Sequence, residues 1–364
     1  MDKGAYTFKA LSTKYEDFRG PAFTIKVGST TFKSVEVPIV SLEVELCADG
    51  SAGGCHFSVE SLYDNENSKW INNVAEVIQV GAKLEIQGGY VKQETIFYGY
   101  VDEYFMAYSG SWAPRLEVTG IDGFGYLMAC QEPVYGGKKK PKDVVEGILK
   151  KAKSAGYAKS YTVGDLSGFD VPILKEKVDD FKYLRMLAEQ YGMSLLAVDG
   201  ELIFDNVIKN SSSLIELTIG SGLLDFQKRF SLQGQVGEVE IWGRDTDQKF
   251  IKGSATSVSI SGKGKTAVQL APKFKQTALR ENNEYVRTEK QCVELAQARL
   301  DAIALNFISG RGACVGLPEL IPGRFITIKG LDEETVGSYF VTKVRHRFSQ
   351  QGYYTEFEVK GAKA

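Results

Sequence analysis

The segment Gly81-Ala82-Lys83-Leu84-Glu85-Ile86-Gln87-Gly88 alternates apolar and polar residues between glycines. This is the pattern of a β-strand that buries one face and is bounded by turns. A segment of the same pattern, Gly323-Arg324-Phe325-Ile326-Thr327-Ile328-Lys329-Gly330, recurs near the C-terminus. The two segments suggest that a strand-rich unit occurs twice in the chain.

Two further pairs of segments match in the same order. Tyr98-Gly99-Tyr100-Val101 aligns with Tyr339-Phe340-Val341-Thr342, and residues 115–120 align with residues 356–361, so that Gly120 falls opposite Gly361. Three ordered matches favour a duplicated β-module. Alternating strands that end in glycine are common, however, and two unrelated small barrels are the alternative.

Between the two copies the hydrophobic period changes from that of strands to that of helices. Pro141 is predicted to open one helix, where its missing N–H is harmless. Asp179 or Asp180 is predicted to cap a second helix that stops at Gly192. Residues 131–210 therefore resemble a small α/β domain.

Strand patterns return after residue 210 and are interrupted once. Thr288 and Gln291 have the spacing of a capping box at the start of a long helix, which Gly310 is predicted to end. We therefore predict an α+β fold, mainly β, with four parts: a first β-barrel in residues 1–130, a small α/β domain in 131–210, a second β-barrel in 211–255 plus 310–364, and an insertion with the long helix in 256–309.

Composition limits the classes of function. The 364 residues include 44 Lys and Arg against 46 Asp and Glu, a net charge of −2, and this near-balance argues against a dedicated nucleic-acid binder. Glycine is abundant at 38 residues and proline scarce at 9, which favours turns between strands over disorder. No apolar run approaches the roughly 18–20 residues of a membrane helix, and residues 1–6 contain no apolar signal core.

Few residues suit catalysis or metal binding. The two histidines, His56 and His346, cannot form a zinc-binding helix motif and are predicted to be structural or surface residues. The five cysteines are expected to be reduced thiols, and whether Cys47 and Cys55 ever pair stays open. No catalytic, cofactor-binding or metal site is therefore predicted.

Four further motifs have ordinary structural interpretations. Gly262-Lys263-Gly264-Lys265-Thr266 ends like a phosphate loop, but Ser259 stands where the first glycine is needed. Since residues 267–270 have a strand pattern, a hairpin tip fits this motif better. The acidic clusters 245–247 and 332–334 and the basic run 138–140 are interpreted as solvated turns and a helix lead-in.

Several segments resemble the baseplate hub family of contractile tails, also called late control D proteins, which supplies the N-terminal part of type VI secretion spike proteins. Their order spans nearly the whole chain, although no single motif is decisive. The segments are Cys55-His56-Phe57-Ser58-Val59, Trp70, residues 80–86, Gly89-Tyr90, residues 97–101, the helix from Asp179 to Gly192, Leu320-Ile321-Pro322-Gly323-Arg324-Phe325, residues 337–346 and Gly352-Tyr353-Tyr354-Thr355. Tyr183-Leu184 stands where this family usually has Phe-Leu.

The resemblance implies a non-enzymatic homotrimer whose two barrel tube domains per chain present six barrels to a hexameric tail tube. The expected partners are an inner tail-tube protein, a separate spike protein, since the chain stops at Ala364, and other baseplate and tape-measure proteins. Assembly in the bacterial cytoplasm into a phage tail, bacteriocin or injection particle is expected, without specific nucleic acid.

Two other classes of protein are kept as alternatives. One is a tail-associated cell-wall hydrolase with a scattered carboxylate pair. The other is a carbohydrate-binding β-protein with Trp70, Trp112 or Trp242 as platforms, although buried packing is the more usual role of such rings.

Overall fold

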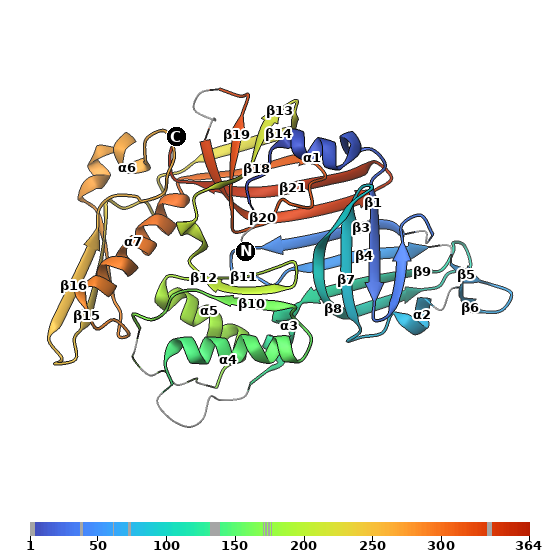
Figure 1. Cartoon of the computed structure of the whole chain (residues 1–364), viewed down its shortest axis with the longest axis horizontal. Helices are drawn as coiled ribbons and strands as arrows, with labels where there is room; N and C mark the ends of the chain where they lie inside the picture. The colour runs from blue at the N-terminus through green and yellow to red at the C-terminus, as the bar shows by residue number, and fades with distance from the viewer. Residues whose placement is uncertain are drawn as a thin grey trace.

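The computed structural model describes residues 4–36, 39–60, 62–71, 74–131, 139–169, 171, 173, 175, 177–332 and 337–364. Its main feature is one sheet of 13 strands in the described part of the chain (Figure 1). In spatial order the strands are β19 (Phe325–Lys329), β13 (Ser213–Ile219), β14 (Gly222–Phe230), β18 (Ile308–Val315), β21 (Gly352–Gly361), β20 (Gly337–Ser349), β3 (Ile39–Cys47), β4 (Gly54–Glu60), β9 (Arg115–Asp122), β8 (Gln93–Ala107), β7 (Lys83–Gly89), β1 (Ala22–Val27) and β2 (Thr30–Lys33). The predicted α+β, mainly β class is confirmed.

Smaller elements flank this sheet. Three short sheets and several helices complete the described structure: β10 (Ser160–Val163), β12 (Glu201–Asp205) and β11 (Ser194–Val198); β16 (Phe250–Ala255), β15 (Glu238–Arg244) and β17 (Ala278–Asn282); β5 (Tyr63–Asp64) and β6 (Lys69–Trp70); and the helices α1 (Phe8–Lys14), α2 (Val74–Val77), α3 (Gly123–Ala129), α4 (Pro141–Ser154), α5 (Asp180–Tyr191), α6 (Ala267–Leu270) and α7 (Glu289–Leu305). None of these described helices combines the length and the apolar character that crossing a lipid bilayer requires.

The large sheet contains two copies of one strand arrangement. In the first copy, the order of neighbouring strands is β3, β4, β9, β8 and β7. In the second copy, the equivalent order is β14, β18, β21, β20 and β19. In the second copy, β19 also pairs with β13 and β20, which closes a barrel of six strands. Among the described residues, the strands of the first copy do not pair into a closed barrel in this way.

Backbone geometry repeats between the copies in detail. The Gly81 N–H donates to the Val101 carbonyl and the Gly323 N–H to the Val341 carbonyl, each over 2.8 Å. Gly81 and Gly323 have φ angles of 81° and 79°, a left-handed conformation that favours glycine at both positions. β8 and β20 each carry a bulge directly after the repeated valine, between Val101 and Glu103 in one and between Val341 and Lys343 in the other.

These hydrogen bonds correct the sequence alignment. Val101 corresponds to Val341, not Thr342, because both make the same pair of backbone bonds. Gly120 pairs with Val101 as Val359 pairs with Val341, so Gly120 corresponds to Val359 and not to Gly361. The second error is a shift of two residues, which keeps every side chain on its own face and so leaves the alternation unchanged.

The insertion is larger than predicted. β15 and β16, expected in the second barrel, form a separate sheet with β17, so residues 231–307 lie outside the large sheet. The long helix ends at Leu305, and Gly310, predicted to end it, lies within β18. There a Cβ would come within 3.1 Å of Phe226, Gln227 and Val359, which explains the glycine.

The starts of three helices follow their predicted signals. Pro141 is the first residue of α4, and the Asp179 side chain accepts a hydrogen bond from the Lys182 N–H at the start of α5. The Thr288–Gln291 capping box opens α7. These local hydrogen bonds satisfy backbone groups that a helix end leaves without partners.

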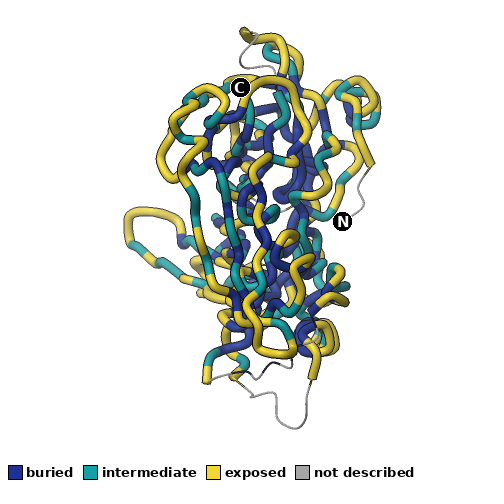
Figure 2. The backbone as a smooth tube through the Cα atoms, turned by 90° about the vertical axis from the view of Figure 1, so that its left-hand side faces the viewer, coloured by how far each residue is buried: buried dark blue, intermediate teal, exposed yellow. Residues whose placement is uncertain are grey.

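Two hydrophobic cores organise the chain. One lies within the two copies of the β-module, and the other joins α3, α4 and α5 to α7 and to the sheet of β15. Leu184 and Leu187 of α5 belong to the same core as Leu295 and Leu300 of α7, although sequence analysis assigned them to separate parts. Figure 2 shows the buried segments along the middle of the molecule, with exposed loops around them.

Asp122 connects the first copy to the second core. This buried carboxylate accepts hydrogen bonds from the Gly53 N–H (2.6 Å) and the Phe124 N–H (2.9 Å). Burial raises the pKa of Asp122 to about 7, although both hydrogen bonds favour the ionised form.

We expect Asp122 to make stability fall as pH rises. Because its pKa is higher in the folded than in the unfolded chain, the stability that it contributes is complete below about pH 4 and is lost as pH rises through 7. The free energy of unfolding, relative to Asp122→Asn, should fall by about 1 kcal/mol per pH unit between these limits. Denaturant titrations of both proteins from pH 4 to pH 8 test this expectation. A constant difference would show that Asp122 titrates normally.

Candidate functional site

The candidate functional surface is the polar face of eight consecutive strands, from β14 to β8 through the junction of β20 with β3. Strand register places two rows of polar side chains across it. One row is Gln227, Arg311, Glu358 and Lys343, and the other is Arg347, Glu43, His56, Thr119 and Glu103. Each row contains charges of both signs, so this face has no strong field of one sign.

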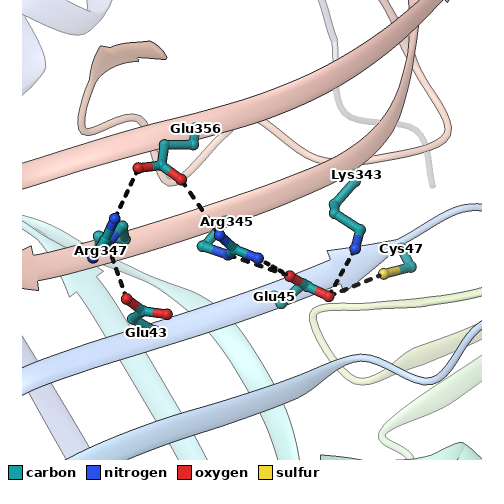
Figure 3. A network of polar contacts seen from close by, with 7 residues as sticks. All are labelled: Glu43, Glu45, Cys47, Lys343, Arg345, Arg347 and Glu356. Carbon is teal, nitrogen blue, oxygen red and sulfur yellow. Dashed lines mark hydrogen bonds and ion pairs between the residues drawn. The ribbon is translucent and has the colours of Figure 1, made fainter. Parts of the chain in front are cut away.

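A network of ion pairs crosses the junction between the two copies (Figure 3). Glu45 of β3 accepts hydrogen bonds from Lys343 Nζ (3.0 Å) and from Arg345 Nη2 (2.7 Å), both on β20. Arg347 Nε lies 2.9 Å from Glu43 Oε1. Glu356 of β21 contacts both arginines, at 3.6 Å from Arg345 Nη1 and 3.1 Å from Arg347 Nη1.

These contacts keep the Glu45 carboxyl group ionised. Burial disfavours its charged form, but the hydrogen bonds from Arg345 and Lys343 outweigh this, and the pKa of Glu45 lies below its usual value. The same bonds raise the pKa of Lys343. Since the side chains are partly exposed, each pair contributes less than about 1 kcal/mol, and the network mainly fixes the register of the two copies.

Each end of the eight-strand segment carries an unpaired edge. β7 pairs with β8 only over residues 93–100, so residues 102–107 of β8 pair with β9 alone among the described residues. β13 pairs with β14 only at Gly222 and Leu223, so residues 224–230 have β18 on one side and no described strand on the other. Unpaired strands of this length can pair with another chain.

The two edges also expose apolar side chains. Phe105 on β8 is 54% exposed, and Tyr108 follows it at 55%. On the other edge, Leu224 is 49% and Phe230 is 41% exposed. Sequence analysis did not predict β14, because most of its residues are polar or exposed. Phe226 and Phe230, on one face of an extended strand, were the available signal.

The two histidines, predicted to be structural or surface residues, lie on this sheet but do not meet. His56 is exposed on β4. His346 is fully buried on β20, where its Nδ1 lies 2.9 Å from the Tyr353 hydroxyl and 3.2 Å from Thr355 Oγ1. Among the described residues, no cluster of His, Cys, Asp and Glu is arranged to hold a metal ion.

Cys47 and Cys55 are separate thiols in the structure, and both are buried. Burial raises the pKa of the Cys47 thiol to about 12 and that of Cys55 as well. Neither is therefore a reactive thiolate near neutral pH.

The phosphate-loop-like motif was interpreted wrongly as a hairpin tip. Residues 267–270 form α6, a single helical turn capped by Thr266, and not a strand. The loop is held by the C-terminus, since the Lys265 N–H donates to the Ala364 carbonyl over 2.6 Å. Because Thr266 and Gln269 form a capping box, local side-chain hydrogen bonds override the strand pattern.

The acidic cluster 245–247 forms a turn, and Asp332 of the second acidic cluster lies 3.6 Å from Lys228 Nζ on β14. Asp245 accepts hydrogen bonds from the Asp247 and Lys249 N–H groups within a turn. Residues 333, 334 and 138 of the other two charged motifs lie outside the described residues.

The three tryptophans belong to different elements. Trp70 packs edge-on against Tyr63 and Tyr108, with ring centroids 5.5 and 6.4 Å away. Trp112 is 49% exposed in the loop after β8, and Trp242 of β15 donates to Glu240 Oε1 over 2.7 Å. The structure therefore does not arrange the three as one platform.

Comparison with known proteins identifies the family. Residues 24–350 match the family described as "Alg8 N-terminal domain". The chain belongs to this family. A search of curated proteins returned no match.

Solved structures share the fold of this Alg8 N-terminal domain family member. The 43 kDa tail protein of prophage MuSo2 from Shewanella oneidensis is 14% identical, with a TM-score of 0.65 over 93% of this chain and 98% of that one. A tail protein from Neisseria meningitidis MC58 is also 14% identical, with a TM-score of 0.64 over 94% and 97% of the two chains.

A third similar structure comes from a secretion system. The E. coli c3393 protein, described as a type VI secretion component with structural similarity to bacteriophage T4 tail proteins, is 11% identical, with a TM-score of 0.55 over 92% of this chain and 76% of that one. At these identities the likeness concerns the fold.

Proposed function

We propose that this protein is a structural, non-enzymatic baseplate hub of a contractile tail or injection particle, in which a homotrimer adapts a hexameric inner tube to a trimeric spike. The observation that carries the proposal is the duplication within one continuous sheet: two copies of one strand arrangement, joined side by side by β20 and β3. Three such chains would present six similar modules around one axis, which matches threefold to sixfold symmetry.

The fold likeness supports this role, because tail proteins and a type VI secretion component share it over nearly the whole chain. The partners we propose are the inner tail-tube protein on one face and a separate spike protein on the other, with other baseplate and tape-measure proteins nearby. The two modules would act as tube domains, with the α/β segment and the insertion between and beside them.

Light scattering tests the assembly. We expect a particle of three times the single-chain mass when the protein is alone, or a complex that contains three copies of the chain when the spike protein is added. A protein that stays monomeric in both mixtures would contradict the hub. Incubation with purified peptidoglycan provides a second test, since a hub should release no soluble fragments and a cell-wall hydrolase should.

A further inference from the structure

The junction inside the chain suggests how one chain meets the next. β20 and β3 pair antiparallel, with Arg345 opposite Glu45 and Val344 opposite Leu46. β20 lies beside β21 as β8 lies beside β9, and β3 lies beside β4 as β14 lies beside β18. The equivalents of the two joined strands are therefore β8 and β14, which are the strands with unpaired edges.

We propose that the free edge of β8 in one copy pairs antiparallel with the free edge of β14 in a second copy, in the register of the internal junction. The inference rests on the proposed trimer and names its contact. The register shows which residues of the two copies are equivalent. On β20 and β8, Lys343 corresponds to Glu103, Val344 to Tyr104, Arg345 to Phe105 and Arg347 to Ala107. On β3 and β14, Glu43 corresponds to Gln227, Glu45 to Arg229 and Leu46 to Phe230. The proposed contact thus places Tyr104 opposite Phe230, Phe105 opposite Arg229, and Ala107 opposite Gln227.

Charge complementarity supports this register. In the internal junction, Lys343 reaches diagonally to Glu45 over 3.0 Å. The corresponding pair between copies is Glu103 with Arg229, a diagonal ion pair with its signs exchanged. Both are exposed, and among the described residues neither has an ion-pair partner within the chain. Each of these two residues is therefore available to pair with the other across the contact between two copies.

Apolar complementarity supports it as well. Val344 and Leu46 are both buried on the core side of the internal junction. Their equivalents, Tyr104 and Phe230, are aromatic and partly or mainly exposed in the single chain. Facing aromatic side chains contribute to cross-strand pairing. Because the two edges differ, the contact is head-to-tail and closes into a ring that leaves no edge of these strands free.

Cysteine crosslinking tests the register directly. Ala107→Cys and Gln227→Cys are prepared in separate chains, both with Cys130→Ser, since Cys130 is the one native cysteine that is not buried. Directly opposite residues lie about 4.5–5.5 Å apart between Cα atoms, within disulfide reach. After oxidation, the mixture of the two should give a covalent dimer, and each alone should give none. A dimer from either single variant alone would overturn the head-to-tail contact.

Charge exchange tests the same contact without new thiols. Glu103→Arg and Arg229→Glu should each weaken trimers at least tenfold, the two together should restore most of the affinity, and the exposed control Lys92→Glu should behave as wild type. Analytical ultracentrifugation measures all four. If wild type is trimeric but the exchange has no effect and the mixture gives no crosslink, the β8–β14 contact is wrong while the hub stands. If wild type stays monomeric both alone and with the spike protein, both proposals fail.

Discussion

Replacing Asp180 with asparagine should lower the free energy of unfolding by about 3 kcal/mol. The Asp180 carboxylate pairs with Lys175 Nζ, and their side chains are 4% and 0% exposed. The substitution keeps the shape of the side chain but removes the negative charge that lies beside the buried Lys175 ammonium. Asp180 also lies at the start of α5, whose apolar face forms part of the second core, so the loss should be measured in chemical denaturation of the whole chain.

A surface pair on α4 provides the control for this prediction. Lys142 and Glu146 lie 3.8 Å apart and are mainly exposed, so Glu146→Gln should cost less than about 0.5 kcal/mol. The double variant Lys175→Met with Asp180→Leu should recover most of the stability, because it buries no charge. A loss for Asp180→Asn as small as that for Glu146→Gln would mean that the pair is solvated in solution.

The duplication is the part of the fold that sequence reasoning finds best. Gly81 and Gly323 bracket strands with the same left-handed turn, and both are visible in the sequence because few other residues adopt that conformation easily. The pairing of Val101 with Gly120 could not be predicted to the residue. Alternation has a period of two and is unchanged by a shift of two, while the bulge after Val101 moves the register by one.

The sheet to which a strand belongs was harder to predict. β15 and β16 have the same alternation as barrel strands, and only the three-dimensional pairing assigns them to the insertion. β14 was missed because most of its side chains are exposed, so it lacks the regular alternation of buried and exposed residues that marks the other strands. The candidate site ends in two such edges, and its position depends on long-range strand pairing that local patterns do not encode.

Glu319→Leu should destabilise the protein by about 3 kcal/mol and release the N-terminal helix. Glu319 is buried, and its Oε1 accepts hydrogen bonds from the Tyr15 hydroxyl (2.7 Å) and from Lys14 Nζ (2.8 Å). Burial and the bond to Glu319 both raise the pKa of Tyr15, so its buried hydroxyl stays a donor that needs an acceptor. Hydrogen exchange should therefore accelerate in α1, which packs beside β13 and ends at Lys14, before it does in the second core.

Glu94 is a matched control because it shares a partner with Glu319. Lys14 Nζ also lies 2.6 Å from Glu94 Oε1, but the Glu94 side chain is 46% exposed and does not contact Tyr15 through a hydrogen bond in the described structure. Glu94→Leu should therefore cost no more than about 1 kcal/mol and leave exchange in α1 nearly unchanged. Equal losses of unfolding free energy from the two substitutions would mean that this contact depends mainly on the charge of Lys14. A larger loss from Glu319→Leu would mean that the contact depends mainly on the buried hydrogen bond between Tyr15 and Glu319. This bond joins the start of the chain to the loop between β18 and β19 and so holds the N-terminal helix against the closed barrel.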